Sequence, residues 1–524
     1  MSSVARLIGE RLHSAGVRHV FGHPGGEVVD LIEGFRAAGL EFVLAKHETG
    51  AAFMAEAMAS SSGRPGACLA TLGPGATNLV TGVAHAYLDR SPLIALTGQL
   101  PVERYETVTH QKLDLRALFA PITKWQARVS AADAGAVTDR ALSIALQPRQ
   151  GPVFLEVPSD VPSQDAAPGG ADPEPQRGAG VPDERSVSEA ATLLGTSARP
   201  VLFAGLDALD AATAEPLRRF IEAWGIPAIL SPKAKGLLRD DHPLVVGTIE
   251  GLGSAKLYEW VARRDLVVMV GFDPVEFDRD WTSAAPVIHL SPLPNVDGYY
   301  RSAVELVGPV PGSLDALRAS AKPKDTTDVA RFRKEFRRFV RPQRSGLTSQ
   351  GVLEALRAAL PEDALVSCDV GFNKSVSIQC WPAYAPRTFF VSNGLSSMGY
   401  GLPAAIGLKL AQPERAVACI LGDGGFAMSV AELETAARLG LAFTVVVLAD
   451  EALQQIKAGQ ERKGFPVTGT TFGALDYVAL ATAFGADGVE ARTLDECGAA
   501  FRDAARSKRV TLIAAHVDPA GYRL

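Results

Sequence analysis

A glycine-rich turn with a single carboxylate follows an apolar stretch in the last third of the chain. Residues 416–421 predict a buried strand, and Gly422-Asp423-Gly424-Gly425 follows at once. Glycines let backbone N–H groups approach a phosphate, whereas a carboxylate repels a phosphate unless a cation lies between the two. The turn therefore indicates a diphosphate bridged by magnesium, although Gly-Asp-Gly alone is also a common structural turn.

Strands and helices that alternate along the chain must position this turn. Residues 443–448 predict the next strand, and Ala449-Asp450-Glu451 stands at its tip. Similar short β-branched runs, each followed by a helical pattern, recur throughout the sequence. This alternation is typical of α/β proteins with parallel sheets, in which ligands bind beyond the carboxyl ends of the strands.

Two stretches interrupt the alternation and divide the chain. Residues 162–187 are rich in Pro, Gly and Asp, which is typical of a linker. Residues 320–347 are basic and polar with a short helical period, and we interpret them as a solvated helix or linker rather than a ligand patch. We therefore predict an α/β fold with three doubly wound parallel-sheet domains, at residues 1–165, 186–320 and 345–524.

Composition excludes several classes of function. The chain has 524 residues, and its 52 Lys and Arg against 58 Asp and Glu give a net charge of −6. Because we interpret the basic stretch at 320–347 as a solvated helix or linker, we expect no nucleic-acid partner. Five scattered cysteines predict buried, reduced thiols rather than disulfides or a zinc site. There is no secretory signal pattern and no long apolar run, so we expect a cytoplasmic protein without a membrane partner.

Further segments accompany the Gly-Asp-Gly turn in a fixed order. They are Lys46-His47-Glu48-Thr49-Gly50-Ala51-Ala52, residues 71–78 (TLGPGATN), residues 89–99 (DRSPLIALTGQ) and residues 393–405 (NGLSSMGYGLPAA). Together with the turns at 422–425 and 449–451, these four segments resemble those of the thiamine-diphosphate-dependent enzymes. They are similar to the acetolactate synthase and pyruvate oxidase branch of that family, of the large catalytic subunit type. The resemblance implies a pyrimidine-binding first domain, a central domain and a diphosphate-binding third domain.

The resemblance also implies individual roles. Glu48 would hydrogen-bond the pyrimidine of thiamine diphosphate, promote its imino tautomer and so help to generate the thiazolium carbanion. Met398 would force the bent conformation of the cofactor, and the backbone carbonyl of Ser396 would accept a hydrogen bond from its 4'-amino group. Gln111 would orient a substrate carbonyl or carboxylate beside the thiazolium, and His110 stands next to it, where it either takes part or only fills space.

The other residues that the resemblance places at the cofactor lie in several turns. They are Pro24, Gly25, Gly73, Asn78, Val370, Gly371, Phe372, Asn373, Gly422, Gly424, Gly425 and Ile456. Gln-His is usual in the synthases where Phe372-Asn373 stands, so Asn373 alone keeps an obvious hydrogen-bond donor.

The metal position departs from the family pattern. The resemblance implies magnesium ligands at Asp423, at the residue that aligns with Ala449 and at the backbone carbonyl of Glu451, but the usual asparagine is replaced by Ala449, which has no side-chain oxygen. Three alternatives remain open. Water molecules could complete a metal site of weaker affinity, the side chain of Asp450 or Glu451 could act as the missing ligand, or the site could have lost metal binding. We expect that thiamine diphosphate and Mg²⁺ still bind, because Glu48, Met398 and Asp423 persist.

Other departures concern the substrate and a second cofactor. The synthases commonly carry lysine where Ser159 stands, which argues against anabolic acetolactate synthesis. The central block lacks a Gly-x-Gly-x-x-Gly pattern, and its loop at 271–277 lacks the arginine of the FAD-binding synthases, so we expect FAD to be absent. Residues 109–114, 120–125 and 454–457 are similar to carboxyethylarginine synthase and sulfoacetaldehyde acetyltransferase, two side branches of the family.

The leading hypothesis is an enzyme that makes or cleaves carbon-carbon bonds by decarboxylating a 2-oxo acid such as pyruvate and transferring the acyl-anion equivalent to an acceptor. The alternatives are a non-decarboxylating lyase or β-elimination catalyst of secondary metabolism, which would act on a 2-oxo acid or an aldehyde, and a catalytically silent homologue. Two subunits enclose each cofactor in the family, which implies a homodimer or homotetramer.

Overall fold

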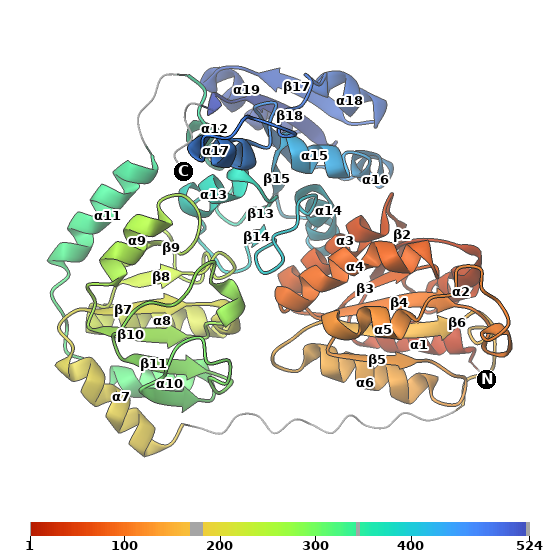
Figure 1. Ribbon diagram of the computed structural model, residues 1–524, viewed down its shortest axis with the longest axis horizontal. Coiled ribbons are helices and arrows are strands. Elements are labelled where there is room, and N and C mark those ends of the chain that lie inside the picture. The colour runs from red at the N-terminus through yellow and green to blue at the C-terminus, as the bar shows by residue number, and fades with distance from the viewer. Residues whose placement is uncertain (1, 168–181, 342–345, 520–524) are drawn as a thin grey trace.

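Three parallel sheets organise the protein. The computed structural model describes residues 2–167, 182–341 and 346–519, and Figure 1 shows three layered α/β units. Each unit contains one six-stranded sheet, and the strand pairs within the sheets are parallel. The predicted fold of three doubly wound parallel-sheet domains is confirmed. No helix of the described ranges is both long enough and apolar enough to span a membrane.

The first sheet has the strand order β2-β1-β3-β4-β6-β5. Its elements are α1 (Val4–Ser14), β1 (His19–His23), α2 (Val29–Ala37), β2 (Glu41–Leu44), α3 (Glu48–Ser62), β3 (Gly66–Ala70), α4 (Pro74–Leu88), β4 (Leu93–Gln99), α5 (Leu115–Phe119), β5 (Trp125–Arg128), α6 (Ala134–Leu146) and β6 (Val153–Pro158).

The central sheet has the order β12-β11-β10-β7-β8-β9. Its elements are α7 (Glu184–Thr196), β7 (Pro200–Ala204), α8 (Ala211–Trp224), β8 (Ala228–Leu230), β9 (Val245–Thr248), α9 (Ser254–Val261), β10 (Leu266–Val270), β11 (Val287–Ser291), β12 (Val304–Val307) and α10 (Val310–Arg318).

The third sheet has the order β14-β13-β15-β16-β18-β17. Its elements are α12 (Ser349–Ala359), β13 (Leu365–Cys368), α13 (Phe372–Cys380), β14 (Phe389–Val391), α14 (Gly401–Ala411), β15 (Val417–Gly422), α15 (Asp423–Ser429), α16 (Glu432–Arg438), β16 (Thr444–Ala449), α17 (Gln454–Arg462), α18 (Tyr477–Ala483), β17 (Asp487–Ala491), α19 (Leu494–Ala504) and β18 (Thr511–His516).

The two stretches predicted to divide the chain differ in structure. Most of the linker predicted at 162–187 lies outside the described residues. The basic stretch contains helix α11 (Thr327–Val340), whose side chains Phe332 and Phe336 are buried against the central domain. These aromatic residues recur at helical spacing and so lie on one face of the helix, which is buried. Only the opposite face is therefore solvated.

The first and third domains share an apolar core. Buried residues of both domains form one cluster, in which α3 packs directly on α14 (Figure 1). The helices approach closely at Gly407, where an added Cβ would lie 2.1 Å from the Met54 carbonyl oxygen. All five cysteines are buried and free, as predicted.

Candidate cofactor and metal site

A cavity of about 250 Å³ opens at the carboxyl edge of the third sheet, where the turns after β13, β15 and β16 meet. It collects most of the cofactor residues predicted for this domain, because their turns end neighbouring strands. The predicted residues that line it are Val370, Gly371, Phe372, Asn373, Met398, Gly422, Asp423, Gly424, Gly425 and Ile456.

Glycines shape the wall of this cavity. An added Cβ on Gly424 would lie 2.7 Å from Met398 Cε, and one on Gly425 would lie 2.7 Å from the Asp369 carboxylate. Gly371 has a φ of +140°, a conformation that other residues rarely adopt. Side chains are therefore excluded, and the backbone itself can approach a bound group.

Asp423 ties the turns of β15 and β16 together. Its carboxylate is buried, and Oδ2 accepts hydrogen bonds from the backbone N–H groups of Asp450 at 2.9 Å and Glu451 at 2.6 Å. Oδ1 accepts a hydrogen bond from the Tyr477 hydroxyl. Tyr477 was missed at the sequence level, because it lies in a distant helix and carries no local motif.

The expectation for the metal position needs correction. Strand β16 runs one residue further than predicted and includes Ala449, which is 4% exposed and packs in the apolar core. Asp450 is the next residue and lines the cavity. Ala449 therefore faces the core rather than the cavity, and the carboxylate that lines the cavity at this strand end is Asp450, whose Oδ1 accepts a hydrogen bond from the Ala452 N–H at 3.2 Å.

Glu451 also departs from its expected role. Its carbonyl oxygen accepts a hydrogen bond from the Phe472 N–H at 2.8 Å, and it does not line the cavity in the described part of the chain. The backbone adopts a left-handed φ of +58° at Glu451, and the next residue, Ala452, lines the cavity instead. The turn thus presents Asp450 and Ala452 to the cavity.

Glu48 begins α3 in the first domain, where its side chain is buried. The Asn78 amide donates a hydrogen bond to Glu48 Oε2 at 3.0 Å. An added Cβ on Gly75 would lie 3.3 Å from Oε1, so the glycine leaves room beside this oxygen. Asn78 is thus placed against the carboxylate of Glu48, which it orients.

The remaining predicted residues of the first domain lie in turns at the same sheet edge. Gly73 and Gln111 both have positive φ values, of +59° and +57°, and an added Cβ on Gly73 would lie 3.0 Å from Gln111 Cβ. His110 and Pro24 are exposed, and Gly25 lies against Thr71. The first domain therefore holds a second group of predicted residues around Glu48 and Gln111.

The two groups occupy separate domains of one chain. All of the described residues that line the cavity around Gly424 belong to the third domain, whereas Glu48 and Gln111 belong to the first. The cavity is therefore lined by glycines, acidic groups and several apolar side chains of the third domain, and Glu48 is not among its lining residues.

Comparisons with known proteins agree with this arrangement. Three domain families match: "Thiamine pyrophosphate enzyme, N-terminal TPP binding domain" at residues 2–118, the "central domain" of the same enzymes at 187–317, and their "C-terminal TPP binding domain" at 369–515.

Relatives match over nearly the whole chain. The acetolactate synthase large subunit of Parasynechococcus marenigrum is 32% identical and covers 99% of this chain and 88% of its own length. The acetolactate synthase of Bacillus subtilis is 30% identical, and the match covers 98% of this chain and 93% of that protein. A protein of Pseudomonas aeruginosa named as a probable 2-ketoarginine decarboxylase is 33% identical, and the match covers 96% of this chain and 92% of that protein. The chain therefore belongs to the thiamine-diphosphate-dependent enzymes of the acetolactate synthase type.

Proposed function

We propose that this enzyme binds thiamine diphosphate through Mg²⁺, decarboxylates a 2-oxo acid and transfers the remaining acyl unit to an acceptor. The glycine-walled cavity that contains Asp423, Asp450 and Met398 is the observation that carries the proposal. When bound, thiamine diphosphate would supply the electron sink for a carbanion at the former carbonyl carbon of the 2-oxo acid. The protein supplies orientation, charge and a proton.

The residues present fit a magnesium diphosphate. Asp423 and Asp450 offer carboxylate oxygens, which Mg²⁺ prefers, and both line the cavity. Two carboxylates facing a diphosphate would repel it, so a cation is required between them. The backbone around Gly424 and Gly425 would hold the diphosphate, and Met398 would support the middle of the cofactor.

Glu48 is the group we assign to proton transfer at the pyrimidine nitrogen. Asn78 fixes Oε2 by a hydrogen bond, and Gly75 leaves room beside Oε1. A carboxyl group in this buried position can share a proton with a weakly basic nitrogen. Gln111, from the exposed loop after β4, would orient the substrate, with His110 beside it.

We further propose that two chains complete each site, as a homodimer or homotetramer. Glu48 and the diphosphate cavity lie in different domains. Large apolar side chains are exposed at or near the cavity, including Met428 at 66%, Ile456 at 56% and Phe472 at 37%. A second copy that brings its first domain over these side chains would bury them and would supply Glu48.

The decarboxylation step can be tested directly. We expect the enzyme to release carbon dioxide from pyruvate, or from a larger 2-oxo acid such as 2-ketoarginine, because the relatives include enzymes named for both kinds of chemistry. Release should require both thiamine diphosphate and Mg²⁺ and should stop with EDTA. Mass spectrometry would identify the products. Cofactor binding without carbon dioxide release from any 2-oxo acid would favour the non-decarboxylating alternative.

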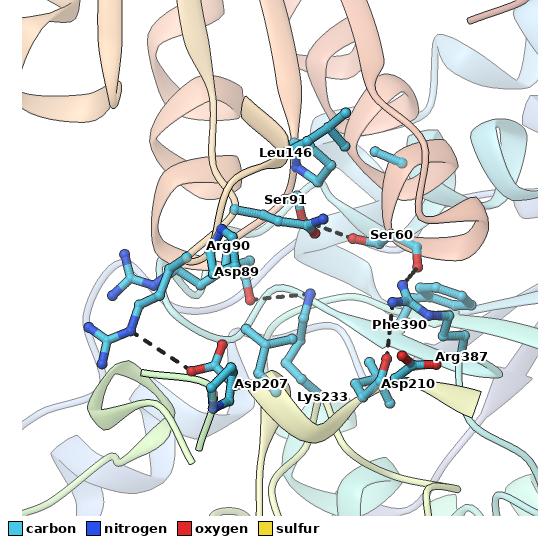
Figure 2. Close-up of a pocket in the computed structure, with 18 of the residues that line it drawn as sticks. Ser60, Asp89, Arg90, Ser91, Leu146, Asp207, Asp210, Lys233, Arg387 and Phe390 are labelled. Atoms are coloured by element: carbon cyan, nitrogen blue, oxygen red, sulfur yellow. Dashed lines mark hydrogen bonds and ion pairs between the residues drawn. The ribbon is translucent and has the colours of Figure 1, made fainter. Parts of the chain in front are cut away.

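We propose that the protein contains no FAD. A cavity of about 320 Å³ lies at the carboxyl edge of the central sheet (Figure 2), but charged contacts between domains cross it. Lys233 Nζ lies 3.4 Å from Asp89 Oδ1, and Arg387 donates a hydrogen bond to the Leu209 carbonyl at 3.0 Å. A flavin there would separate these partners. Purified protein should therefore be colourless, and a yellow protein with flavin absorption would contradict this proposal.

A further inference from the structure

Four titratable side chains that the proposed reaction does not use are buried where the three domains meet. Glu56 and His85 are 0% exposed, Asp89 is 2% exposed and Lys233 is 6% exposed. Glu56 belongs to α3, His85 and Asp89 lie at the end of α4, and Lys233 follows β8 of the central domain. Figure 2 shows Lys233 directed toward Asp89.

These side chains form one chain of ion pairs. His85 Nε2 lies 3.2 Å from Glu56 Oε2, and His85 Nδ1 lies 2.8 Å from Asp89 Oδ2. Lys233 Nζ lies 3.4 Å from the other oxygen of Asp89. Burial opposes the charged imidazolium, but the carboxylates of Asp89 and Glu56 outweigh it and raise the pKa of His85 to about 9. Two positive and two negative groups therefore balance in the interior.

The cluster bonds to the segment of the third domain that leads into the cavity. Asp89 Oδ1 accepts hydrogen bonds from the backbone N–H groups of Asn393 at 3.2 Å and Gly394 at 3.3 Å. His85 Nδ1 lies 3.0 Å from the Ser392 hydroxyl oxygen, which accepts a hydrogen bond from the Ser397 N–H at 2.9 Å. The cluster therefore contacts the backbone before Ser396 directly, and it reaches the backbone after Ser396 through the Ser392 hydroxyl.

Ser396 needs such support. Its φ is +52°, a left-handed conformation that is unfavourable for a residue with a side chain and persists only where the surroundings hold it. On the far side of the segment, the Asp369 carboxylate accepts hydrogen bonds from the N–H groups of Gly399 at 3.0 Å and Gly401 at 2.9 Å. Met398, between these two anchors, reaches the cavity.

We propose that His85, Asp89 and Lys233 are positioning residues, which hold residues 392–398 so that the Ser396 carbonyl and the Met398 side chain are preformed for thiamine diphosphate. Lys233 and His85 keep the Asp89 carboxylate charged and in place, and Asp89 and Ser392 hold the backbone. Each of the three domains contributes to this arrangement. That these residues prepare Ser396 and Met398 for thiamine diphosphate rests on the proposed function. That they hold residues 392–398 by hydrogen bonds does not.

The test compares variants that remove the hydrogen bonds between the buried cluster and residues 392–398 in different ways. Ser392→Ala removes one hydroxyl without changing the buried charges. Ser313→Ala is its control, because Ser313 in helix α10 is also buried and, among the described residues, its hydroxyl bonds only to the carbonyl of Pro309, which precedes the helix. Asp89→Ala removes the acceptor for Asn393 and Gly394, whereas Asp89→Asn keeps a carbonyl oxygen there. Hydrogen–deuterium exchange of residues 392–401 is measured without cofactor, and binding of thiamine diphosphate with Mg²⁺ is measured by calorimetry.

We expect Ser392→Ala and Asp89→Ala to speed exchange in 392–401 and to weaken cofactor binding by about 10-fold, similar to the loss of other outer-shell partners. Asp89→Asn keeps the acceptor but removes the charge that pairs with Lys233 and His85, so it should restore the slow exchange and the cofactor binding only in part. Ser313→Ala should match the wild type. Unchanged exchange and binding in Ser392→Ala, or no rescue by Asp89→Asn, would overturn the proposal. If the wild type fails to bind cofactor, the proposed function fails, while the exchange results still decide whether the cluster holds the segment.

Discussion

Replacing Glu48 by glutamine should reduce turnover of the 2-oxo acid substrate by about 10²- to 10⁴-fold, the usual contribution of a positioned acid or base. The amide has the same shape and still offers an oxygen to the Asn78 side chain, which donates to Glu48 at 3.0 Å in the native protein. It cannot exchange a proton with the pyrimidine nitrogen. Calorimetry should therefore show nearly unchanged binding of thiamine diphosphate, and the loss should appear in kcat.

Glu33→Gln is a matched control for this variant. Glu33 is an exposed glutamate on α2 that, within the part of the chain that the structure describes, pairs only with Arg36, so the same chemical change there should leave kcat unaltered. Undiminished turnover in Glu48→Gln would refute the assignment of Glu48. A variant that loses cofactor binding together with turnover would instead show that Glu48 acts mainly in holding the pyrimidine.

Much of the fold and of the diphosphate cavity could be predicted because their signals are local. A run such as residues 416–421 indicates a buried strand by its composition, and the glycine-rich turn after it must lie at the carboxyl edge of the sheet. Residues 370–373 and 422–425 meet there because β13 and β15 are neighbours in the sheet. The roles that we propose for Glu48 and Met398 come from the family resemblance, because no local pattern could have provided them.

The error at Ala449 has a simple physical origin. Successive side chains of a strand point to opposite faces, so one residue decides whether a side chain faces the core or the site. Strand β16 continues through Ala449, which faces the core, and Asp450 reaches the cavity. Strand ends are poorly marked in sequence, since the apolar run at 443–449 shows no break before Asp450.

Other parts of the site depend on contacts between distant residues. The Tyr477 hydroxyl reaches Asp423 from a helix far along the chain, and Lys233 reaches Asp89 from a different domain. A single tyrosine or lysine has no spacing pattern that identifies its partner. Only the packing of the three domains brings these groups together, so the sequence alone could not predict them.

Asp423→Asn should weaken magnesium-dependent binding of thiamine diphosphate by about 100-fold or more. Losing an outer-shell partner of a metal costs about 10–100-fold, and a direct ligand should cost at least the upper end of that range. Asparagine still accepts the N–H groups of Asp450 and Glu451, so the turn should keep its shape. The measurement is a magnesium titration of cofactor binding, with the melting temperature as a check on folding.

Asp450 and Ala449 provide the matched comparison. Asp450→Ala should raise the magnesium concentration needed for half-maximal binding by about 10-fold or more, because Asp450 lines the cavity. Ala449→Ser should leave it unchanged, since that side chain packs in the core. If Ala449→Ser changed this magnesium concentration and Asp450→Ala did not, position 449 would be the ligand position, as the family pattern implied.

Mixing the Glu48→Gln and Asp423→Asn variants, at magnesium and thiamine diphosphate concentrations that saturate the native site but not the Asp423→Asn site, then tests how the site is assembled. In a hybrid dimer of Glu48→Gln and Asp423→Asn chains, a site shared between chains pairs the native Glu48 of one copy with the native Asp423 of the other, while the second site carries both changes. Random mixing should therefore restore about a quarter of wild-type activity, because half of the dimers are hybrids and each has one intact site. If each site were built from a single chain, every site would carry one damaging change, and the mixture would be no more active than its parents.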